Sequence, residues 1–221
     1  MNFQTKKYTI VKEAVSKDLA NFVYNYFLIK RQVAKTLFET KTISPNETLF
    51  GTWNDSMIPN TYSHYGDIAM ETLLLKLQPL MEKITKLKLS PNYAYARIYK
   101  KGDTLFRHKD RFSCEISTTM HLGGDNWPIF LEPDESKGGT DLKTGNYKPS
   151  KSKGVKVMLE PGDMLVYRGD LLEHWRDKFK GEDCAQVFLH YNNIKTSGSE
   201  KNIFDTRIHI GLPDYFKRND K

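Results

Sequence analysis

The stretch from Tyr93 to Asp110 reads YAYARIYKKGDTLFRHKD, and its first seven residues alternate in character. Successive side chains of an extended strand point to opposite faces, so this segment predicts a strand over 93–99. One face would carry Tyr93, Tyr95, Arg97 and Tyr99, and the other Ala94, Ala96 and Ile98. The phenol and guanidinium groups suit the wall of a cavity, whereas the small aliphatic face suits packing against another layer.

The same stretch ends in a His-x-Asp pair, His108 and Asp110, after a turn at Gly102. Two residues apart on extended backbone, these side chains point the same way. His174 follows a second predicted strand and would bring a third ligand from a distant part of the chain. Two imidazoles and one carboxylate leave open positions on a non-haem Fe(II) ion. His-x-acid pairs are frequent by chance, so a surface His108 and a merely hydrogen-bonded His174 beside Trp175 remain alternatives.

The predicted helices come before most of the predicted strands. Ser16 can cap a first helix, and its expected buried face consists of Leu19, Phe22, Val23, Tyr26, Phe27, Val33 and Leu37. A second helix is expected from about Asp67 to Leu87, and Pro79 inside it predicts a kink because proline removes a backbone donor. An irregular aromatic loop, 50–65, lies between the two helices.

Short alternating segments make up most of the rest of the chain. Strands are expected at Tyr8–Val11, Glu115–Leu122, Ile129–Leu131, Val155–Leu159, Met164–Arg168 and Ala185–Tyr191. Many short strands with turns between them indicate a sandwich or barrel, and polar strand faces favour a jelly roll with a lined pocket. We expect a mainly β fold with N-terminal helices in one domain, 1–221, with helical support over 1–90, a core over 91–194 and a C-terminal cap over 195–221.

Composition constrains the partners and the cellular compartment that we expect for the protein. A formal charge of +7 favours anionic partners, but the lysines are scattered and equally fit an ordinary solvated surface. The N-terminus lacks the apolar run of a signal peptide, and no stretch is long enough for a membrane span. With only Cys114 and Cys184, we expect a reduced, soluble, cytoplasmic protein without a disulfide framework.

From about Tyr93 to Tyr191 the sequence resembles the prolyl-4-hydroxylase-like branch of the 2-oxoglutarate/Fe(II)-dependent oxygenases. The matching text is YARIYKKGDTLFRHKD (95–110), PGDMLVYRG (161–169), EHWR (173–176) and QVFLHY (186–191), in that order. The resemblance implies a double-stranded β-helix (jelly-roll) core and iron held by His108, Asp110 and His174. It also implies 2-oxoglutarate and O2 as cosubstrates, with release of succinate and CO2. A carboxylate at 110 implies hydroxylation, since related halogenases have a small residue there.

This chain departs from the branch at the residue that binds the far carboxylate of 2-oxoglutarate. The branch places a basic residue where this chain has Asp183 and Cys184. A buried carboxylate needs a cation or strong donors. Candidates on the polar strand faces are Arg97, Tyr99, His121, Gln186 and His190, with Arg97 or a His121/His190 pair as the replacement for the missing cation. Alternatively, Arg97 pairs with an acid at the rim of the barrel.

The substrate is left open by the sequence. We rank a peptidyl residue such as proline first, a small molecule such as a free amino acid second, and methylated nucleic acid third. A non-catalytic, cupin-like module with another metal at the same ligands also remains. The loop 132–153 has almost nothing to bury and is either a functional lid or disordered.

Overall fold

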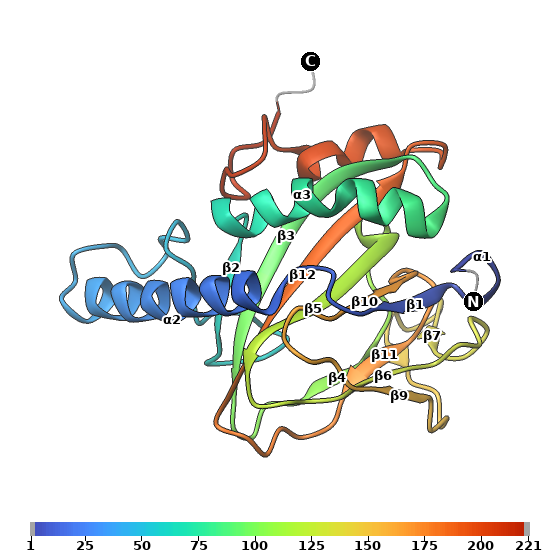
Figure 1. The fold of residues 1–221 in the computed structure, drawn as a ribbon, viewed down its shortest axis with the longest axis horizontal. Coiled ribbons are helices and arrows are strands. Elements are labelled where there is room, and N and C mark those ends of the chain that lie inside the picture. The colour runs from blue at the N-terminus through green and yellow to red at the C-terminus, as the bar shows by residue number, and fades with distance from the viewer. Residues whose placement is uncertain (1–2, 219–221) are drawn as a thin grey trace.

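The computed structural model describes residues 3–218 (Figure 1). Its helices are α1 (Phe3–Lys6), α2 (Lys17–Glu39) and α3 (Ile68–Thr85), with 3-10 turns η1 (Phe112–Cys114) and η2 (Ser199–Thr206). The longer strands are β3 (Leu89–Lys100), β5 (Ile116–Gly124) and β12 (Asp183–Asn193). The shorter ones are β1 (Tyr8–Val11), β2 (Tyr62–Tyr65), β4 (Leu105–His108), β6 (Ile129–Leu131), β7 (Gly139–Thr140), β8 (Tyr147–Lys148), β9 (Val155–Val157), β10 (Met164–Tyr167) and β11 (His174–Arg176).

Two antiparallel sheets form the body of the protein. The larger has the strand order β1-β10-β5-β12-β3-β2, and the smaller the order β4-β11-β6-β9. Strands far apart in sequence alternate within each sheet, which is the connectivity of a jelly roll. The predicted mainly β fold with a jelly-roll core is confirmed, and so are the strands expected at Tyr8–Val11 and Ile129–Leu131.

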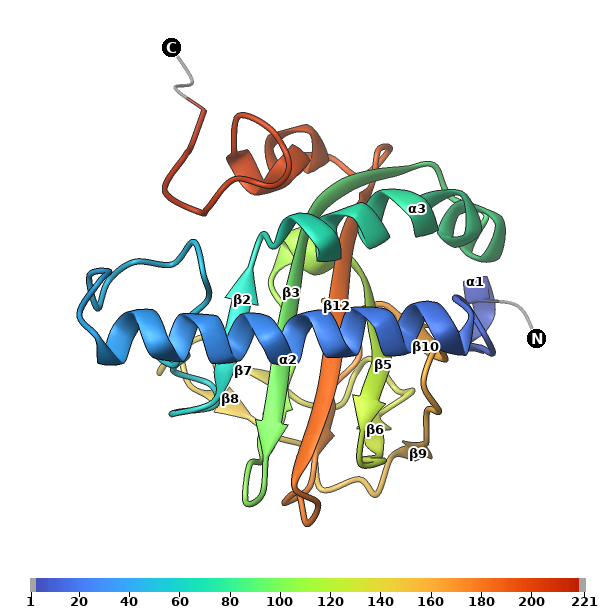
Figure 2. The same cartoon turned by 60° about the vertical axis from the view of Figure 1, so that its left-hand side comes forward.

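The two long helices cover the outer face of the larger sheet, and α2 runs across its strands (Figure 2). Each helix begins at a residue whose side chain accepts from the first turn: Ser16 from Leu19 N at 3.2 Å, and Asp67 from Met70 N at 3.0 Å. These bonds satisfy donors that a helix start leaves without partners. The small aliphatic face of β3 packs beneath the helices, as its alternation predicts.

The predicted buried face of α2 is partly wrong. Phe22 and Val33 are exposed, at 72% and 43%. The residues of α2 that are buried are Ala20, Val23, Phe27 and Ala34. At about 100° per residue, Phe22 and Val33 lie roughly a third of a turn from this line. A helix resting on a sheet buries only a narrow stripe, so an apolar residue at the edge of that stripe stays in water.

The loop 132–153, whose order the sequence left open, contains the β7–β8 hairpin. It is anchored by the buried carboxylate of Glu173, which accepts hydrogen bonds from Ser150 N at 2.8 Å and Tyr147 Oη at 3.1 Å. Lys109 also donates to Gly138 O at 2.9 Å. The loop is therefore held by residues that directly neighbour His108 and His174 in the sequence.

The segment after β12 packs back against the body. Arg207 is fully buried and pairs with Glu71 of α3 at 2.6 Å. Asp205 accepts from Arg111 at 2.8 Å and from Tyr65 at 2.8 Å. Cys114 and Cys184 are both buried and free. Among residues 3–218, no helix combines the length and the apolar character needed to cross a membrane.

Candidate metal centre and cavity

The three predicted metal ligands come from two neighbouring strands of the smaller sheet and from the segment that follows one of them. His108 ends β4 and His174 begins β11, and the two residues are direct partners in the antiparallel pairing of these strands. Asp110 follows β4, and its backbone N–H donates to Gly169 O at 2.8 Å. Local extended backbone aligns His108 with Asp110, while strand pairing brings in His174 from 66 positions away.

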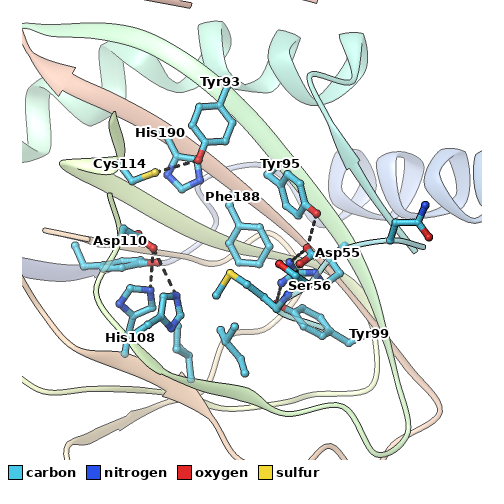
Figure 3. Close-up of a pocket in the computed structure, with 17 residues that line it drawn as sticks. Asp55, Ser56, Tyr93, Tyr95, Tyr99, His108, Asp110, Cys114, Phe188 and His190 are labelled. Carbon is cyan, nitrogen blue, oxygen red and sulfur yellow. Dashed lines mark hydrogen bonds and ion pairs between the residues drawn. The ribbon is translucent and has the colours of Figure 1, made fainter. Parts of the chain in front are cut away.

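The ligand atoms face a common point, and Figure 3 shows the ring of His108 turned toward Asp110. Nε2 of His108 and Nε2 of His174 each lie 3.5 Å from Oδ1 of Asp110. One ligand atom from each residue lies within 4.8 Å of the others. The structure thus brings together the three residues for which the sequence predicts iron binding.

Hydrogen bonds fix the orientation of both imidazoles. Nδ1 of His108 contacts Phe106 O at 2.7 Å, and Nδ1 of His174 contacts Leu172 O at 2.9 Å. A carbonyl oxygen only accepts, so each Nδ1 carries the proton and a neutral ring would turn the lone pair of Nε2 toward Asp110. Two lone pairs and a carboxylate aimed at one point repel one another unless a cation lies between them. The donor set therefore fits Fe(II) or another divalent ion.

The carboxylate of Asp110 stays ionised in this setting. Burial opposes its charge, but while the two rings are protonated the charge of His174 and a hydrogen bond from His108 hold the pKa of Asp110 well below its usual value. A cation bound among the three residues would take the place of these protons. Ser117 Oγ also donates to Oδ2 of Asp110 at 3.0 Å. For His108, burial is outweighed by the hydrogen bond to Asp110, which raises the pKa of the ring. An anionic Asp110 is the form that a metal ion needs.

A second group of potential ligands shares Asp110 and adds Cys114 and His190. Burial strongly raises the pKa of the Cys114 thiol and lowers the pKa of His190 to about 4. Cys114 Sγ lies 3.0 Å from Tyr93 Oη. This group offers one imidazole, and its Nδ1 lies 2.9 Å from Ser117 Oγ, so the site of the two histidines is the better match to a non-haem iron centre.

The metal ligands open onto a cavity of about 450 Å³. Its lining residues are Asn54, Asp55, Ser56, Met57, Tyr93, Tyr95, Arg97, Tyr99, Leu105, His108, Asp110, Cys114, Ile129, Tyr167, His174, Phe188 and His190. The predicted polar face of β3 lies on its wall, and the loop before β2 closes one side (Figure 3). Its volume is in the usual range of small-ligand pockets.

Arg97 lines this cavity, but its charge already has a partner. Its side chain is 5% exposed and forms an ion pair with Asp55 of the loop before β2. The same guanidinium donates to Tyr99 Oη at 2.9 Å. Tyr95 also donates to Asp55. The alternative that Arg97 pairs with an acid is the arrangement that the structure shows, and it makes Arg97 a weaker candidate for a cosubstrate carboxylate.

The other predicted cosubstrate residues are spread along the barrel. Tyr99 and His190 line the cavity, whereas His121 and Gln186 do not. The ring nitrogens of His121 contact Leu159 O and Gly123 O, both at 3.0 Å. Burial lowers the pKa of His190 to about 4, so this ring is neutral, and burial also lowers the pKa of His121 although its two carbonyl contacts oppose that shift. His190 pairs in register with Ser117, four positions along β5 from His121, so the two histidines do not form a cationic pair.

A buried arginine that sequence reasoning missed lies two residues after His174. Arg176 is 1% exposed, and its side chain reaches from β11 to Thr119 Oγ1 of β5 at 3.2 Å. Strand alternation could have found it, because on β11 positions 174 and 176 share a face. Thr119 in turn donates to Gln186 Oε1 at 3.0 Å, and Gln186 donates to Cys184 Sγ at 3.2 Å.

Solved structures with the same architecture are numerous, although no family model and no curated protein matches the chain. A prolyl-4-hydroxylase from Pseudomonas putida aligns with a TM-score of 0.56 and 13% identity, over 86% of this chain and 95% of that one. The fold is that of the 2-oxoglutarate/Fe(II)-dependent oxygenases. HygX from Streptomyces hygroscopicus, solved with nickel, 2-oxoglutarate and hygromycin B, aligns at 0.56 and 14% identity over 87% and 85% of the two chains. The α-ketoglutarate-dependent epimerase SnoN of nogalamycin biosynthesis aligns at 0.60 and 12%, over 100% and 88%. The predicted fold family of the sequence is thereby confirmed.

Proposed function

We propose that the protein is an Fe(II)- and 2-oxoglutarate-dependent dioxygenase that hydroxylates an unactivated C–H bond. The observation that carries this proposal is the convergence of His108, Asp110 and His174 on one point at the wall of a cavity. Three protein ligands leave positions for a bidentate 2-oxo acid and for O2. The carboxylate of Asp110 occupies the position that related halogenases keep free for halide, which favours hydroxylation.

The residues of the chain have definite roles in this reaction. Nε2 of His108, Nε2 of His174 and Oδ1 of Asp110 would hold the iron. Iron bound there would couple oxidation of 2-oxoglutarate by O2, giving succinate and CO2, to insertion of the second oxygen atom into the C–H bond. Leu172 O and Phe106 O keep each imidazole in the ligating tautomer. The apolar and aromatic wall excludes water from the reacting centre.

The leading substrate is a peptidyl residue such as proline, on the strength of the sequence resemblance and of the fold shared with a prolyl-4-hydroxylase. A small molecule is the second candidate. The Asp55–Arg97 pair at one end of the cavity supports it, because such a pair offers both charges to a zwitterion. HygX shares the fold and was solved with hygromycin B.

Anaerobic titration with Fe(II) and 2-oxoglutarate, followed in the visible, tests the class of reaction. We expect a charge-transfer band at one equivalent of iron and release of succinate when air is admitted. Tight zinc binding without a band or succinate would instead identify a non-catalytic metal module. A panel of proline peptides, free amino acids and methylated oligonucleotides then tests the substrate. A +16 mass shift on a peptide supports the first candidate, one on a free amino acid the second, and formaldehyde release indicates a demethylase.

A further inference from the structure

The guanidinium of Arg176 is buried between the two sheets without an acidic partner among residues 3–218. It donates to the backbone oxygen of Trp127 and to Thr119 Oγ1 at 3.2 Å, and it lies 5.2 Å from the centre of the Trp127 ring. All of these partners are neutral. Nε of Arg176 has no hydrogen-bond partner among the described residues. A guanidinium has five N–H donors, so Arg176 has N–H groups left to donate to a bound ligand.

Two other deeply buried arginines in the protein are neutralised by carboxylates. Arg97 pairs with Asp55, and Arg207 pairs with Glu71 at 2.6 Å. A buried charge without a counter-ion is strongly unfavourable, even after the surroundings relax. Burial accordingly lowers the pKa of Arg176, and no carboxylate opposes that effect. The exception at Arg176 indicates that its counter-ion is an anion from outside the chain.

The distance between Arg176 and the metal ligand His174 indicates which kind of molecule carries this anion. Arg176 and His174 lie on the same face of β11, about 7 Å apart at the rise of a strand. That spacing matches the length of a five-carbon diacid whose 2-oxo acid end is bound at His174. Arg176 itself lies behind the cavity wall, and Leu105, which lies opposite it in register, lines the cavity. Tyr99 and Tyr167, whose phenols interact electrostatically with Arg176, line it as well.

We propose that Arg176 binds the far carboxylate of 2-oxoglutarate and replaces the basic residue that is absent at 183 and 184. The inference rests on the proposed function, since it assigns one end of the cosubstrate. Arg176 enters from the smaller sheet and donates to Thr119 of the larger one. It also interacts electrostatically with Cys184, one of the two positions where the branch carries its basic residue. Tyr99 lines the cavity and its hydroxyl accepts from Arg97, so its own proton is available for the same carboxylate.

Binding measurements on paired ligands test this assignment. The two ligands are 2-oxoglutarate and 2-oxopentanoate, which carries a methyl group in place of the far carboxylate. Wild type, Arg176→Met, Arg176→Lys and Arg97→Met are loaded anaerobically with Fe(II), and each ligand is titrated by its charge-transfer band. Arg31→Met is the matched control, because Arg31 lies on α2 outside the cavity. Thermal unfolding and iron stoichiometry show which variants are folded and loaded.

We expect Arg176→Met to weaken 2-oxoglutarate at least about 50-fold, as for loss of a buried charge-assisted contact. Its affinity for 2-oxopentanoate should change less than about threefold, because that ligand never makes the contact. Arg176→Lys should weaken 2-oxoglutarate about three- to tenfold, since one ammonium replaces a bidentate fork. The Arg31→Met control should match wild type for both ligands.

Unchanged 2-oxoglutarate affinity in folded Arg176→Met would overturn the assignment. If that variant does not fold, unchanged affinity in Arg176→Lys overturns it, as does a wild-type protein that binds both ligands equally well. A ligand-specific loss in Arg97→Met alone would transfer the role to Arg97. Absence of any band in the wild type contradicts the proposed function itself, so the two failures are distinguishable.

Discussion

Gly169 lies directly against Asp110, the carboxylate of the candidate metal centre. Its backbone oxygen accepts from Asp110 N at 2.8 Å. A Cβ on Gly169 would overlap with Oδ2 of Asp110 and lie 2.5 Å from Ser117 Oγ and 2.7 Å from Cys114 O. The position of the metal-binding carboxylate therefore depends on a residue without a side chain, 59 positions later in the sequence.

Replacement of Gly169 by alanine should displace Asp110 and weaken metal binding. The backbone of Gly169 is not in the left-handed region, so the effect is steric and local. We expect an Fe(II) or Ni(II) affinity at least about tenfold lower, measured by competition with a chromogenic chelator, and a folded protein by circular dichroism. Gly139→Ala is the control, because a Cβ there meets nothing within 4 Å. Equal metal affinity in Gly169→Ala and wild type would contradict the close packing described above.

Alanine at His108, Asp110 or His174 should abolish stoichiometric iron binding. Each replacement removes one of three ligands, and the remaining two bind a divalent ion far more weakly. The measurement is metal content after desalting, together with the charge-transfer band. His209→Ala is the matched control, since His209 is exposed and its one hydrogen bond within residues 3–218 is to its own neighbour, Ile210 O. Full iron occupancy in any two of the three variants would be incompatible with the site.

Asp55→Asn should destabilise the protein and loosen the loop before β2. The replacement leaves the charge of Arg97, 5% exposed, without its counter-ion. Loss of one partner of a buried pair costs about 2–4 kcal/mol. Urea unfolding measures this cost, and limited proteolysis measures opening of 50–61. Asp55→Asn combined with Arg97→Met should recover part of the lost stability, because the unpaired charge is then absent. Additive losses in the double variant would show that the two residues are not coupled.

Asp67→Ala should lower stability in a pH-dependent way. Asp67 caps α3 and also accepts from Tyr26 Oη of α2 at 2.7 Å. Burial opposes its charge, but a hydrogen bond from His64 and the charge of Lys30 outweigh it and hold the pKa of Asp67 well below its usual 3.8. Loss of the cap and of the buried pair should cost about 2–4 kcal/mol at neutral pH.

The sign of the pH dependence follows from the lowered pKa. A carboxyl group whose pKa is depressed in the folded state stabilises the protein above its unfolded pKa, and this contribution fades as pH falls through the folded value. The difference in unfolding free energy between wild type and Asp67→Ala should therefore be largest near pH 7 and smaller at pH 3. Urea titrations at the two pH values measure it. A difference that grows in acid would contradict an ionised Asp67 in the folded protein.

Local patterns in the sequence were enough for much of the fold. The alternation over 93–99 predicts a strand with one aliphatic and one polar face, because the period of an extended chain needs no distant partner. The Ser16 cap marks the start of the first helix for the same reason, and the helical period places the start of the second near Asp67. His108 and Asp110 share one local segment of backbone, so their common direction is also predictable from the sequence.

Tertiary structure decided which side chains have partners. The exposure of Phe22 depends on how narrowly α2 rests on the sheet, which the helical period does not encode. Arg97 forms an ion pair with Asp55, 42 residues away, and is therefore not free to bind another anion. The partners of Arg176 among residues 3–218 are neutral groups. The free energy of a buried charge depends on every group around it, and those groups come from separate strands. Sequence therefore determined the strand face and the ligand types, and only the assembled barrel decided which buried arginine has no acidic partner among residues 3–218.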